Sequence, residues 1–262
     1  MEIWDYRLGE IMLYFIFVIG VIFGSFYNVV GMRLPNNESL IKPGSHCPKC
    51  GHMLKWYENI PLISYVVLGG SCKKCKQPIS STYFLMELLS GALFALCYKV
   101  FGLSINFYLS IIIASLIIII FVSDSKYMII NDSPLVASII LIFLIKWYDG
   151  GIVSSLISLL YGLGIFAFAY LLKVFGYLAF KQEALGGGDI KLSFVAGMLL
   201  GIKLGIVYVV LASFLAFPYA LYVTFKNKDN MLPFGPFLVS SLLIVFLNAD
   251  TFNKVLYTLF NI

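Results

Sequence analysis

Long runs of apolar residues constrain this chain more than any other feature of its sequence. Residues 109–122 and 204–223 contain no Asp, Glu, Lys or Arg, and runs of this kind span membranes as helices. Only 12% of the residues are charged, whereas soluble domains carry about a quarter. With a mean hydropathy of +0.95, the sequence predicts an all-α polytopic membrane protein.

About eight transmembrane helices account for the apolar segments. The first covers residues 11–30, and the acidic residues before it argue against a cleaved signal peptide, whose first region is basic. We expect the other helices at residues 83–100, 105–122, 133–147, 152–176, 190–201, 204–225 and 234–248. We find no internal repeat.

A polar insert follows the first helix. Residues 33–82 contain seven Lys or Arg and two Glu, so their balance of 7 − 2 = +5 equals the formal net charge of the whole chain. Cytoplasmic loops carry this excess, which predicts a cytoplasmic insert and an outside N-terminus. The connections at 123–132, 177–189 and 226–233 then also face the cytoplasm. A basic loop beside a membrane indicates contact with anionic lipid rather than nucleic acid.

Two pairs of cysteines lie in this insert, with 21 residues between the pairs: Cys47, Cys50, Cys72 and Cys75. Thiolates at this spacing converge on one tetrahedral metal ion, and so small a loop needs a staple. Disulfides are the alternative, which a reducing cytoplasm disfavours. We therefore predict a structural zinc ion. His46 and His52 are expected not to be ligands, and Lys146 is expected to snorkel towards the outer surface.

Two aspartates stand at the cytoplasmic ends of apolar segments. Asp189 directly follows Gly186, Gly187 and Gly188, and Asp124 follows the run that ends at Val122. An ionisable residue there is expensive to desolvate and indicates function, and glycines allow close approach of another chain. Two such carboxylates brought together share a proton, the state that aspartyl proteolysis uses. The alternatives are that Asp189 caps the next helix and that the two aspartates are unrelated.

An ordered set of motifs over nearly the whole chain resembles the type IV prepilin leader peptidases, which are membrane aspartyl endopeptidases of the GxGD class. The set comprises the two cysteine pairs, Asp124, Gly186-Gly187-Gly188-Asp189, Gly24-Ser25-Phe26 with Asn28-Val29-Val30, Asn59-Ile60-Pro61 with Ser64, Glu87 after Tyr83, and Pro233-Phe234-Gly235-Pro236. The resemblance implies that Asp124 and Asp189 cleave the basic leader of prepilins and pseudopilins at the cytoplasmic membrane. It also implies methylation of the new N-terminal amine by S-adenosylmethionine, with no donor site assigned.

The resemblance implies a division into a first transmembrane helix (1–31), a zinc-binding loop domain (32–82) and a membrane-embedded aspartyl peptidase domain (83–262). One motif departs from the family. Where the family commonly has Ile-Pro-Asp, this chain has Ile130-Asn131-Asp132. We expect Asp132 to be a turn cap or a substrate contact, and Gly186, Gly187 and Gly188 to let the substrate approach.

Two other functions remain open from the sequence. The aspartates could relay protons or bind a cation in a transporter, or the chain could be a non-catalytic, zinc-binding factor in pilus assembly. Charged residues deep inside several spans would favour transport, and Glu87 is the only strong candidate besides the two aspartates. This scarcity favours the peptidase, whose partners would be prepilins or pseudopilins and membrane lipid.

Overall fold

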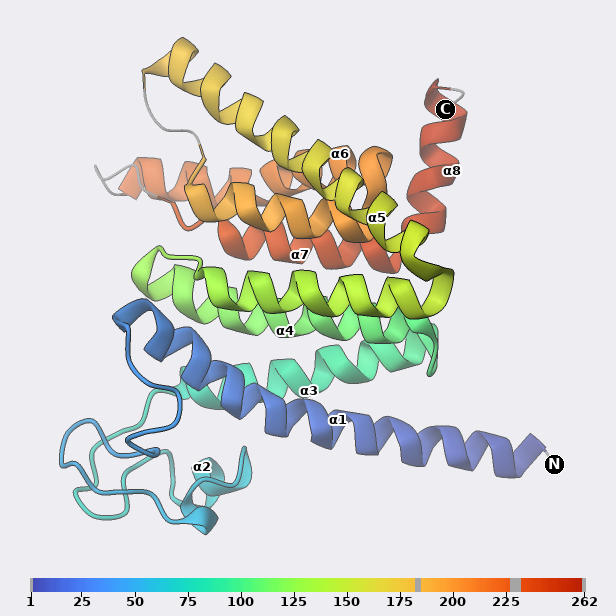
Figure 1. The fold of residues 1–262 in the computed structure, drawn as a ribbon. Helices are drawn as coiled ribbons and strands as arrows, with labels where there is room; N and C mark the ends of the chain where they lie inside the picture. Colours follow the sequence, from blue (N-terminus) through green and yellow to red (C-terminus); the bar gives the residue numbers. More distant parts are fainter. Residues whose placement is uncertain (1, 182–184, 227–231, 261–262) are drawn as a thin grey trace. The chain divides into compact units, whose positions relative to one another are not determined.

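The computed structural model describes residues 2–181, 185–226 and 232–260, whose regular secondary structure is helical apart from isolated β-bridges (Figure 1). The helices are α1 (Glu2–Arg33), α2 (Ile63–Val67), α3 (Ser81–Phe101), α4 (Ile105–Tyr127), α5 (Asp132–Phe180), α6 (Gly187–Lys226), α7 (Gly235–Leu247) and α8 (Ala249–Phe260), with 3-10 turns η1 (Leu34–Asn36) and η2 (Trp56–Glu58). Five described helices are long and apolar enough to cross a membrane, or six if α7 and α8 form one broken span. The prediction of an all-α integral membrane protein is confirmed.

Two of the long helices are each broken at a glycine. Gly151 in α5 has φ 72° and Gly201 in α6 has φ 74°, a backbone region that favours glycine. The Ser155 hydroxyl donates to the carbonyl of Phe143 at 3.0 Å, so the halves of α5 lie side by side, and Figure 1 shows α5 turning back. The break at Gly151 falls between two helices that the sequence predicts separately, and the break at Gly201 falls on the last residue of the helix predicted at 190–201. Whether all eight segments cross the membrane stays a prediction.

The predicted connections differ from the structure in their lengths. α4 continues to Tyr127 and α6 begins at Gly187, so the connections at 123–132 and 177–189 are shorter than expected. Hydropathy marks where a chain leaves the membrane, whereas a helix continues for as long as its backbone hydrogen bonds are made. Residues 182–184 and 227–231, within two of those connections, lie outside the described residues.

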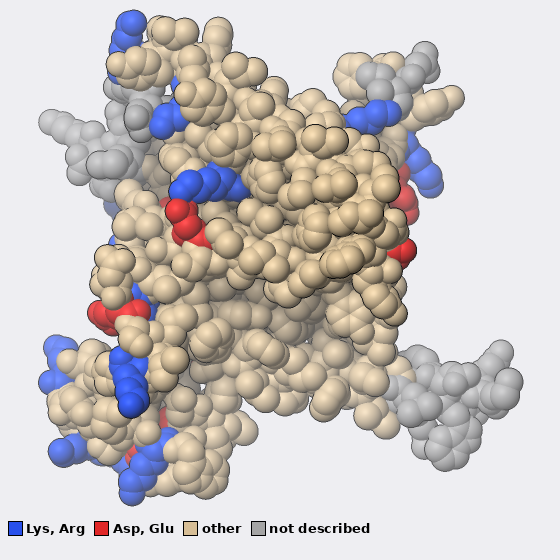
Figure 2. All heavy atoms as spheres, in the orientation of Figure 1, with Lys and Arg blue, Asp and Glu red and all other residues tan. Residues whose placement is uncertain are grey.

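The chain forms two compact units, Met1–Gly102 and Leu103–Ile262. The first contains α1, α3 and the insert between them, and the second contains α4 to α8. Figure 2 shows a mostly uncharged face on the helices and Lys or Arg side chains gathered over the insert. The functional division at residues 31 and 82 stays a prediction, because compactness does not show which residues act together.

In the first unit, α1 and α3 pack through small residues. A Cβ atom on Gly20 would lie 2.8 Å from the Cβ of Phe94 and 2.8 Å from the carbonyl oxygen of Ser90. A Cβ on Gly24 would lie 2.7 Å from the Cβ of Ser90. Small residues let membrane helices approach this closely. The side-chain amide of Asn28 adds a hydrogen bond to the Tyr83 carbonyl at 3.3 Å. Gly24 and Asn28, the two motif residues named here, therefore both contact α3.

In the second unit, α4 is the core helix. It packs against α5 and α7, while α6 packs against α5 and α7. Ile113 and Ile118 are fully buried on different faces of α4, as expected for a helix that is apolar all round. Its C-terminal turn, which carries Asp124, is therefore held by packing on several sides.

Replacing Gly20 by Leu should destabilise the first unit by about 1–3 kcal/mol, because extra methylenes in a packed interior force neighbours apart. Gly9→Leu in the same helix is the control, since a Cβ there meets nothing within 4 Å. Thermal unfolding in detergent measures both. Equal Tm values for the two variants would show that α1 and α3 are not packed this closely.

Candidate functional site

Asp124 lies in the last turn of α4, where its carboxylate receives a backbone N–H from another helix. Its Oδ2 accepts a hydrogen bond from the N–H of Gly235 at 2.9 Å. Gly235 is the first residue of α7, and the first N–H groups of a helix lack intrahelical partners and carry partial positive charge. A Cβ on Gly235 would lie 2.8 Å from this Oδ2. Glycine is therefore required here, which gives the Pro233-Phe234-Gly235-Pro236 motif a physical role.

Asp189 is the third residue of α6 and binds the start of its own helix. Its Oδ2 accepts a hydrogen bond from the N–H of Gly186 at 3.1 Å. This is the backward half of a capping box, in which the third helical residue bonds the N–H just before the helix. Asp189 therefore caps its own helix, as one alternative from the sequence proposed. This capping bond uses only one carboxylate oxygen, so Asp189 remains a candidate site residue.

The structure brings the two aspartates together through Ile130. A Cβ on Gly188 would lie 2.7 Å from the Cβ of Ile130, and one on Gly235 would lie 3.0 Å from its Cδ1. Asp124 is 6% exposed and Asp189 is 9% exposed, and they are close enough for their charges to interact. Among the described residues, no group donates a hydrogen bond to the Oδ1 of either aspartate. Each carboxylate therefore has one oxygen held and one oxygen available.

The three glycines before Asp189 differ in what they face. A Cβ on Gly186 would lie 3.2 Å from Oδ2 of Asp189, and Gly188 packs on Ile130. Only at Gly187, of these three, would a Cβ meet nothing within 4 Å. Their common role as the substrate's approach stays a prediction, and Gly187 has the open space that this role needs.

Asp132 forms an ion pair that the sequence did not indicate. The Nζ of Lys191 lies 2.7 Å from both carboxylate oxygens of Asp132, and both side chains are more than half exposed. Asp132 begins α5 and caps no turn, since its only described partner is Lys191. Contact with the substrate stays a prediction. Beside it, the Nδ2 of Asn131 is buried and has no partner among the described residues.

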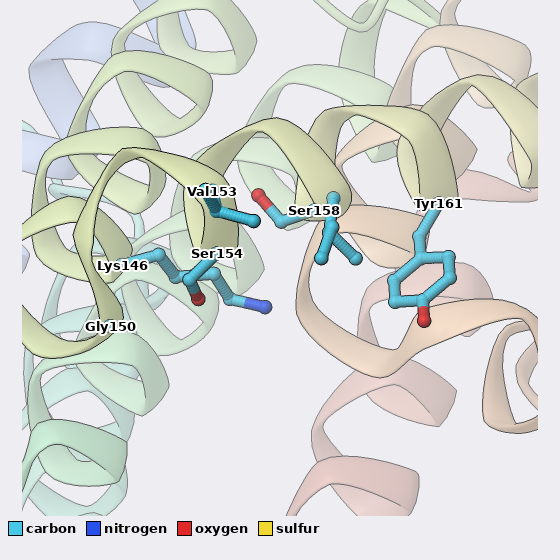
Figure 3. A pocket seen from close by; sticks show the side chains of 7 residues that line it. Lys146, Gly150, Val153, Ser154, Ser158 and Tyr161 are labelled. Atoms are coloured by element: carbon cyan, nitrogen blue, oxygen red, sulfur yellow. The ribbon is translucent and has the colours of Figure 1, made fainter.

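A cavity of about 360 Å³ is lined by residues of α5 (Figure 3). Lys146, Ser154 and Tyr161 are among its lining residues, and Lys146 donates to the carbonyl of Met198 at 2.7 Å. Fourteen residues of α5 separate Lys146 from Asp132, or about 21 Å along the helix. The break at Gly201 leaves carbonyls such as that of Met198 without helical partners. Lys146 satisfies one of them, so the expectation that it snorkels outwards is wrong.

The four cysteines of the insert form one cluster. Their Sγ atoms all lie within 4.8 Å of one another, with 3.8 Å between Cys47 and Cys75 and 3.9 Å between Cys50 and Cys72. Metal–sulfur bonds of about 2.3 Å in a tetrahedron place the sulfurs about 3.8 Å apart. All four thiols are free rather than paired as disulfides. The cluster could therefore bind one metal ion, as the spacing predicts.

The two cysteine pairs fold into the same turn. The N–H of Gly51 donates to the carbonyl of Cys47, and that of Lys76 donates to the carbonyl of Cys72, both at 2.9 Å. Gly51 and Lys76 both have positive φ, 67° and 57°. The two turns are thus equivalent at an offset of 25 residues, although little besides the cysteines is shared in their sequences.

Backbone donors in these turns favour the metal-binding form of the first cysteine of each pair. The N–H of Cys50, with a neighbouring N–H, lowers the pKa of the Cys47 thiol to about 6. The N–H of Cys75 likewise lowers the pKa of Cys72, against the opposing effect of burial. The thiolate is the form that binds metals, so the turns favour that form at Cys47 and Cys72. At Cys50 the His52 N–H acts in the same direction, but burial and the neighbouring thiols together raise the pKa.

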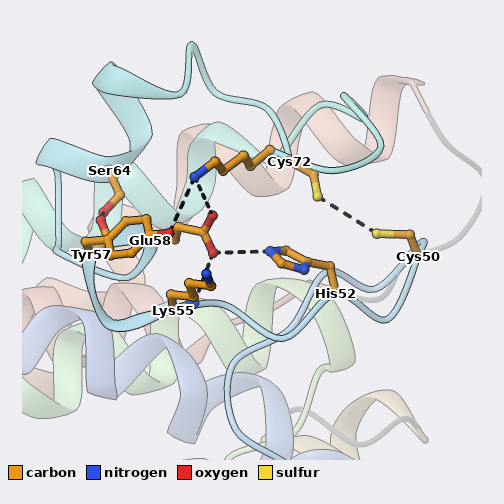
Figure 4. A network of polar contacts seen from close by, with 8 residues as sticks. Cys50, His52, Lys55, Tyr57, Glu58, Ser64 and Cys72 are labelled. Carbon is orange, nitrogen blue, oxygen red and sulfur yellow. Dashed lines mark hydrogen bonds and ion pairs between the residues drawn. The ribbon is translucent and has the colours of Figure 1, made fainter.

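Glu58 ties the two turns together in a network that the sequence did not reveal (Figure 4). Its Oε2 accepts from the N–H of Lys55 at 2.9 Å and lies 3.2 Å from Nε2 of His52, while Lys73 lies 3.6 Å from Oε1. The Lys55 N–H, then His52 and Lys73, lower the pKa of Glu58 against its burial. Its stabilising contribution is therefore present above the ordinary pKa of glutamate and is lost as the pH falls through the lowered pKa.

Glu87 anchors the insert to α3. Its Oε2 accepts a hydrogen bond from the N–H of Leu62 at 2.8 Å, directly after the Asn59-Ile60-Pro61 motif. Leu62 has φ 59°, a conformation that a leucine adopts only when its surroundings hold it there. Glu87 is buried, and this bond gives its carboxylate a structural partner. It does not resemble an unpaired charge along an ion pathway.

Apolar helices, two buried carboxylates at neighbouring helix ends and a four-cysteine insert define an integral membrane protein with a site for acid–base chemistry. Residues 18–101 match the model of the bacterial peptidase A24 N-terminal domain, and residues 111–221 match that of the type IV leader peptidase family. The chain belongs to the type IV leader peptidase family and is an enzyme of that peptidase class.

Similar curated proteins carry the name prepilin leader peptidase/N-methyltransferase. The protein of Bacillus subtilis (strain 168) is 34% identical over 244 residues, which cover 92% of this chain and 96% of the relative. That of Vibrio cholerae is 31% identical, with 87% and 94% covered. That of Myxococcus xanthus is 35% identical over 182 residues, and the match covers 69% of this chain but 54% of the relative. No solved structure matches the chain significantly.

The purified protein should contain one metal ion per chain, and Cys50→Ser should lose it, because one missing thiolate removes most of the binding energy of a structural site. Elemental analysis referred to protein concentration measures this. Cys97→Ala is the control, since Cys97 lies in α3 outside the cluster. Well under one ion in the unaltered protein, or full retention by Cys50→Ser, would contradict the assignment.

Proposed function

We propose that this enzyme removes the N-terminal leader of prepilins or pseudopilins, with Asp124 and Asp189 as the catalytic pair. The observation that carries this proposal is that one oxygen of each buried carboxylate is held by a backbone N–H at a helix start, while Oδ1 of each is left available. The substrate class is inferred from the names of the relatives.

The pair can work as an acid and a base. Two nearby carboxylates at a partly dehydrated site share one proton. The ionised carboxylate takes a proton from water as the water attacks the scissile carbonyl, and the protonated one donates a hydrogen bond to the carbonyl oxygen. The N–H groups of Gly235 and Gly186 fix the orientation of the carboxylates. Such preorganised groups need no rearrangement during the reaction.

The proposed topology has eight spans, an outside N-terminus and a cytoplasmic insert in the bacterial cytoplasmic membrane. The breaks at Gly151 and Gly201 support it, since each divides a helix that is too long for one span. Asp124 and Asp189 then lie at the cytoplasmic ends of their helices. A prepilin leader is charged and the segment after it is apolar. The bond between them would reach the membrane surface at that depth.

The metal of the cysteine cluster is proposed to be structural zinc. Zinc prefers four thiolates in a tetrahedron, which agrees with the sulfur separations of 3.8 and 3.9 Å. Bound zinc supplies folding energy to a loop with a small core, and the four cysteines would hold it. No step of peptide hydrolysis passes through this ion.

Transport and a purely structural role in pilus assembly are less well supported. The intramembrane charges that a transporter would need are bound elsewhere, Glu87 by the Leu62 N–H and Lys146 by the Met198 carbonyl. A non-catalytic role leaves the buried pair without a purpose, since burying two carboxylates together is costly. Membership of a peptidase family favours catalysis.

Asp124→Asn and Asp189→Asn should each lower leader cleavage by about 10²–10⁴, the usual contribution of a positioned acid or base. Asp132→Asn should lower cleavage by less than about tenfold, because an exposed ion pair contributes about 1 kcal/mol or less. Mass spectrometry of a co-expressed prepilin measures leader loss, and membrane insertion is checked by fractionation. Full cleavage by either single variant of the pair would refute the assignment. Inactive Asp132→Asn would move the first catalytic role to Asp132.

We further propose that the enzyme methylates the new N-terminal amine with S-adenosylmethionine, as the relatives' names suggest. Hydrolysis needs only the carboxylate pair and water, whereas methyl transfer needs a bound donor and a free amine. Cys50→Ser, which damages the insert, should therefore lower methylation more than cleavage, and Asp189→Asn should still methylate a supplied mature pilin. Labelled donor measures the transfer. Loss of both activities in Asp189→Asn, with both kept in Cys50→Ser, would contradict this division.

A further inference from the structure

A groove of about 290 Å³ opens beside the Asp132–Lys191 ion pair and has no part in the chemistry described above. Five apolar side chains from both halves of α5 and from α6 line it: Leu135, Val136, Ile139, Phe166 and Phe194. We propose that this groove holds the apolar segment of the substrate that follows the scissile bond. The inference rests on the proposed function and assigns the surface that positions the substrate.

One end of the groove lies near the helix ends that carry the catalytic pair. Lys191 follows Asp189 by two residues near the start of α6. Asp132 follows Ile130 by two residues, and Ile130 packs against Gly188. Both members of the ion pair are thus fixed to the segments that carry the carboxylates. A substrate cut at the pair would therefore have its following segment at the same end of α5 and α6 as this end of the groove.

The groove runs from that end into the apolar part of the helices. Its residues from the first half of α5 extend from Asp132 to Ile139, seven residues or about 10 Å along the helix, and Phe194 lies three residues beyond Lys191 on α6. This length matches two turns of an apolar helix. Helices bind such grooves through side chains at positions i, i+3, i+4 and i+7. The cut bond would then lie at the membrane surface and the bound helix below it.

The charges of the groove select for an uncharged segment. Asp132 and Lys191 are its charged lining residues among those described, and Lys191 lies 2.7 Å from both oxygens of Asp132. The charges of Asp132 and Lys191 are therefore already paired with each other. A charged side chain placed deeper would lose its hydration without gaining a partner. The occupant must be apolar beyond its first turn, as the segment after a prepilin leader is.

A lipid acyl chain is the competing occupant, and the ion pair gives it no specific contact. A phospholipid would gain no bond from its phosphate to Lys191 here, because Asp132 already binds that cation at the mouth of the groove. A peptide segment needs no such partner, because its own backbone polar groups are satisfied within its helix.

Val136→Trp tests the groove because it fills the space with a larger side chain, and Leu141→Trp is the matched control. Val136 is 52% exposed and Leu141 is 50% exposed on the same half of α5, but Leu141 does not line the groove. With full-length prepilin, Val136→Trp should raise KM by about tenfold or more with kcat nearly unchanged, the sign of lost ground-state binding. Leu141→Trp should change neither. Equal kinetics for the two variants would overturn the proposal.

A second measurement does not depend on turnover. A photo-cross-linking amino acid replaces Val136, or Leu141 as the control, in an Asp189→Asn background that retains uncleaved prepilin. Mass spectrometry should find Val136 cross-links on substrate residues after the scissile bond, and fewer at Leu141. Cross-links to phospholipid, to the leader, or equally from both positions would overturn the proposal. If the unaltered enzyme cuts prepilin while this result fails, only the groove is wrong. If it cuts no prepilin, the proposed function fails instead.

Discussion

Two backbone N–H groups, from Gly235 and Gly186, each hold one oxygen of a buried aspartate, and the second unit is arranged around this constraint. A carboxylate removed from water needs donors, and most backbone N–H groups in a helical membrane protein are already used inside helices. Only the first N–H groups of a helix are free. The start of α7 must therefore meet the end of α4, whereas Asp189 is held at the start of its own helix, α6. Glycine at 235 follows, because a Cβ would lie 2.8 Å from the carboxylate of Asp124.

The glycine breaks let this convergence happen in a single unit. α5 and α6 are 49 and 40 residues long, and unbroken helices of that length would carry their ends far beyond a bilayer about 30 Å thick. Gly151 and Gly201 turn the chain back instead. A break in a membrane helix exposes carbonyl groups, and Lys146 binds one of them, on Met198. The carbonyl group that the break exposes is thus hydrogen-bonded inside the unit, at the end away from the aspartates.

The sequence predicted the features that depend on local composition. Apolar runs located the helices, including both halves of α5 and α6. Counting spans placed Asp124 and Asp189 at the same end, and two CxxC pairs predicted the thiol cluster. Glu58, Lys191 and the Gly235 N–H were not predicted as partners, because each acts on a residue brought near it by folding. The Asp132–Lys191 pair joins residues 59 apart, and nothing in their spacing indicates a contact.

The partners of the carboxylates differ between the insert and the candidate active site, and the difference fits their tasks. Glu58 has His52 and Lys73 beside it, and such cations stabilise the charged form of a carboxylate. That suits a structural acid, whose charge should not change. Among the described residues, no cation pairs with Asp124 or Asp189. Lys191 is the cation nearest to Asp189 in sequence, and Asp132 binds it with both oxygens at 2.7 Å. A lysine beside either aspartate would favour its ionised form, whereas the proposed mechanism needs the pair to share one proton. Backbone N–H groups orient the aspartates without adding a full charge, as the proposed exchange of a proton with water requires.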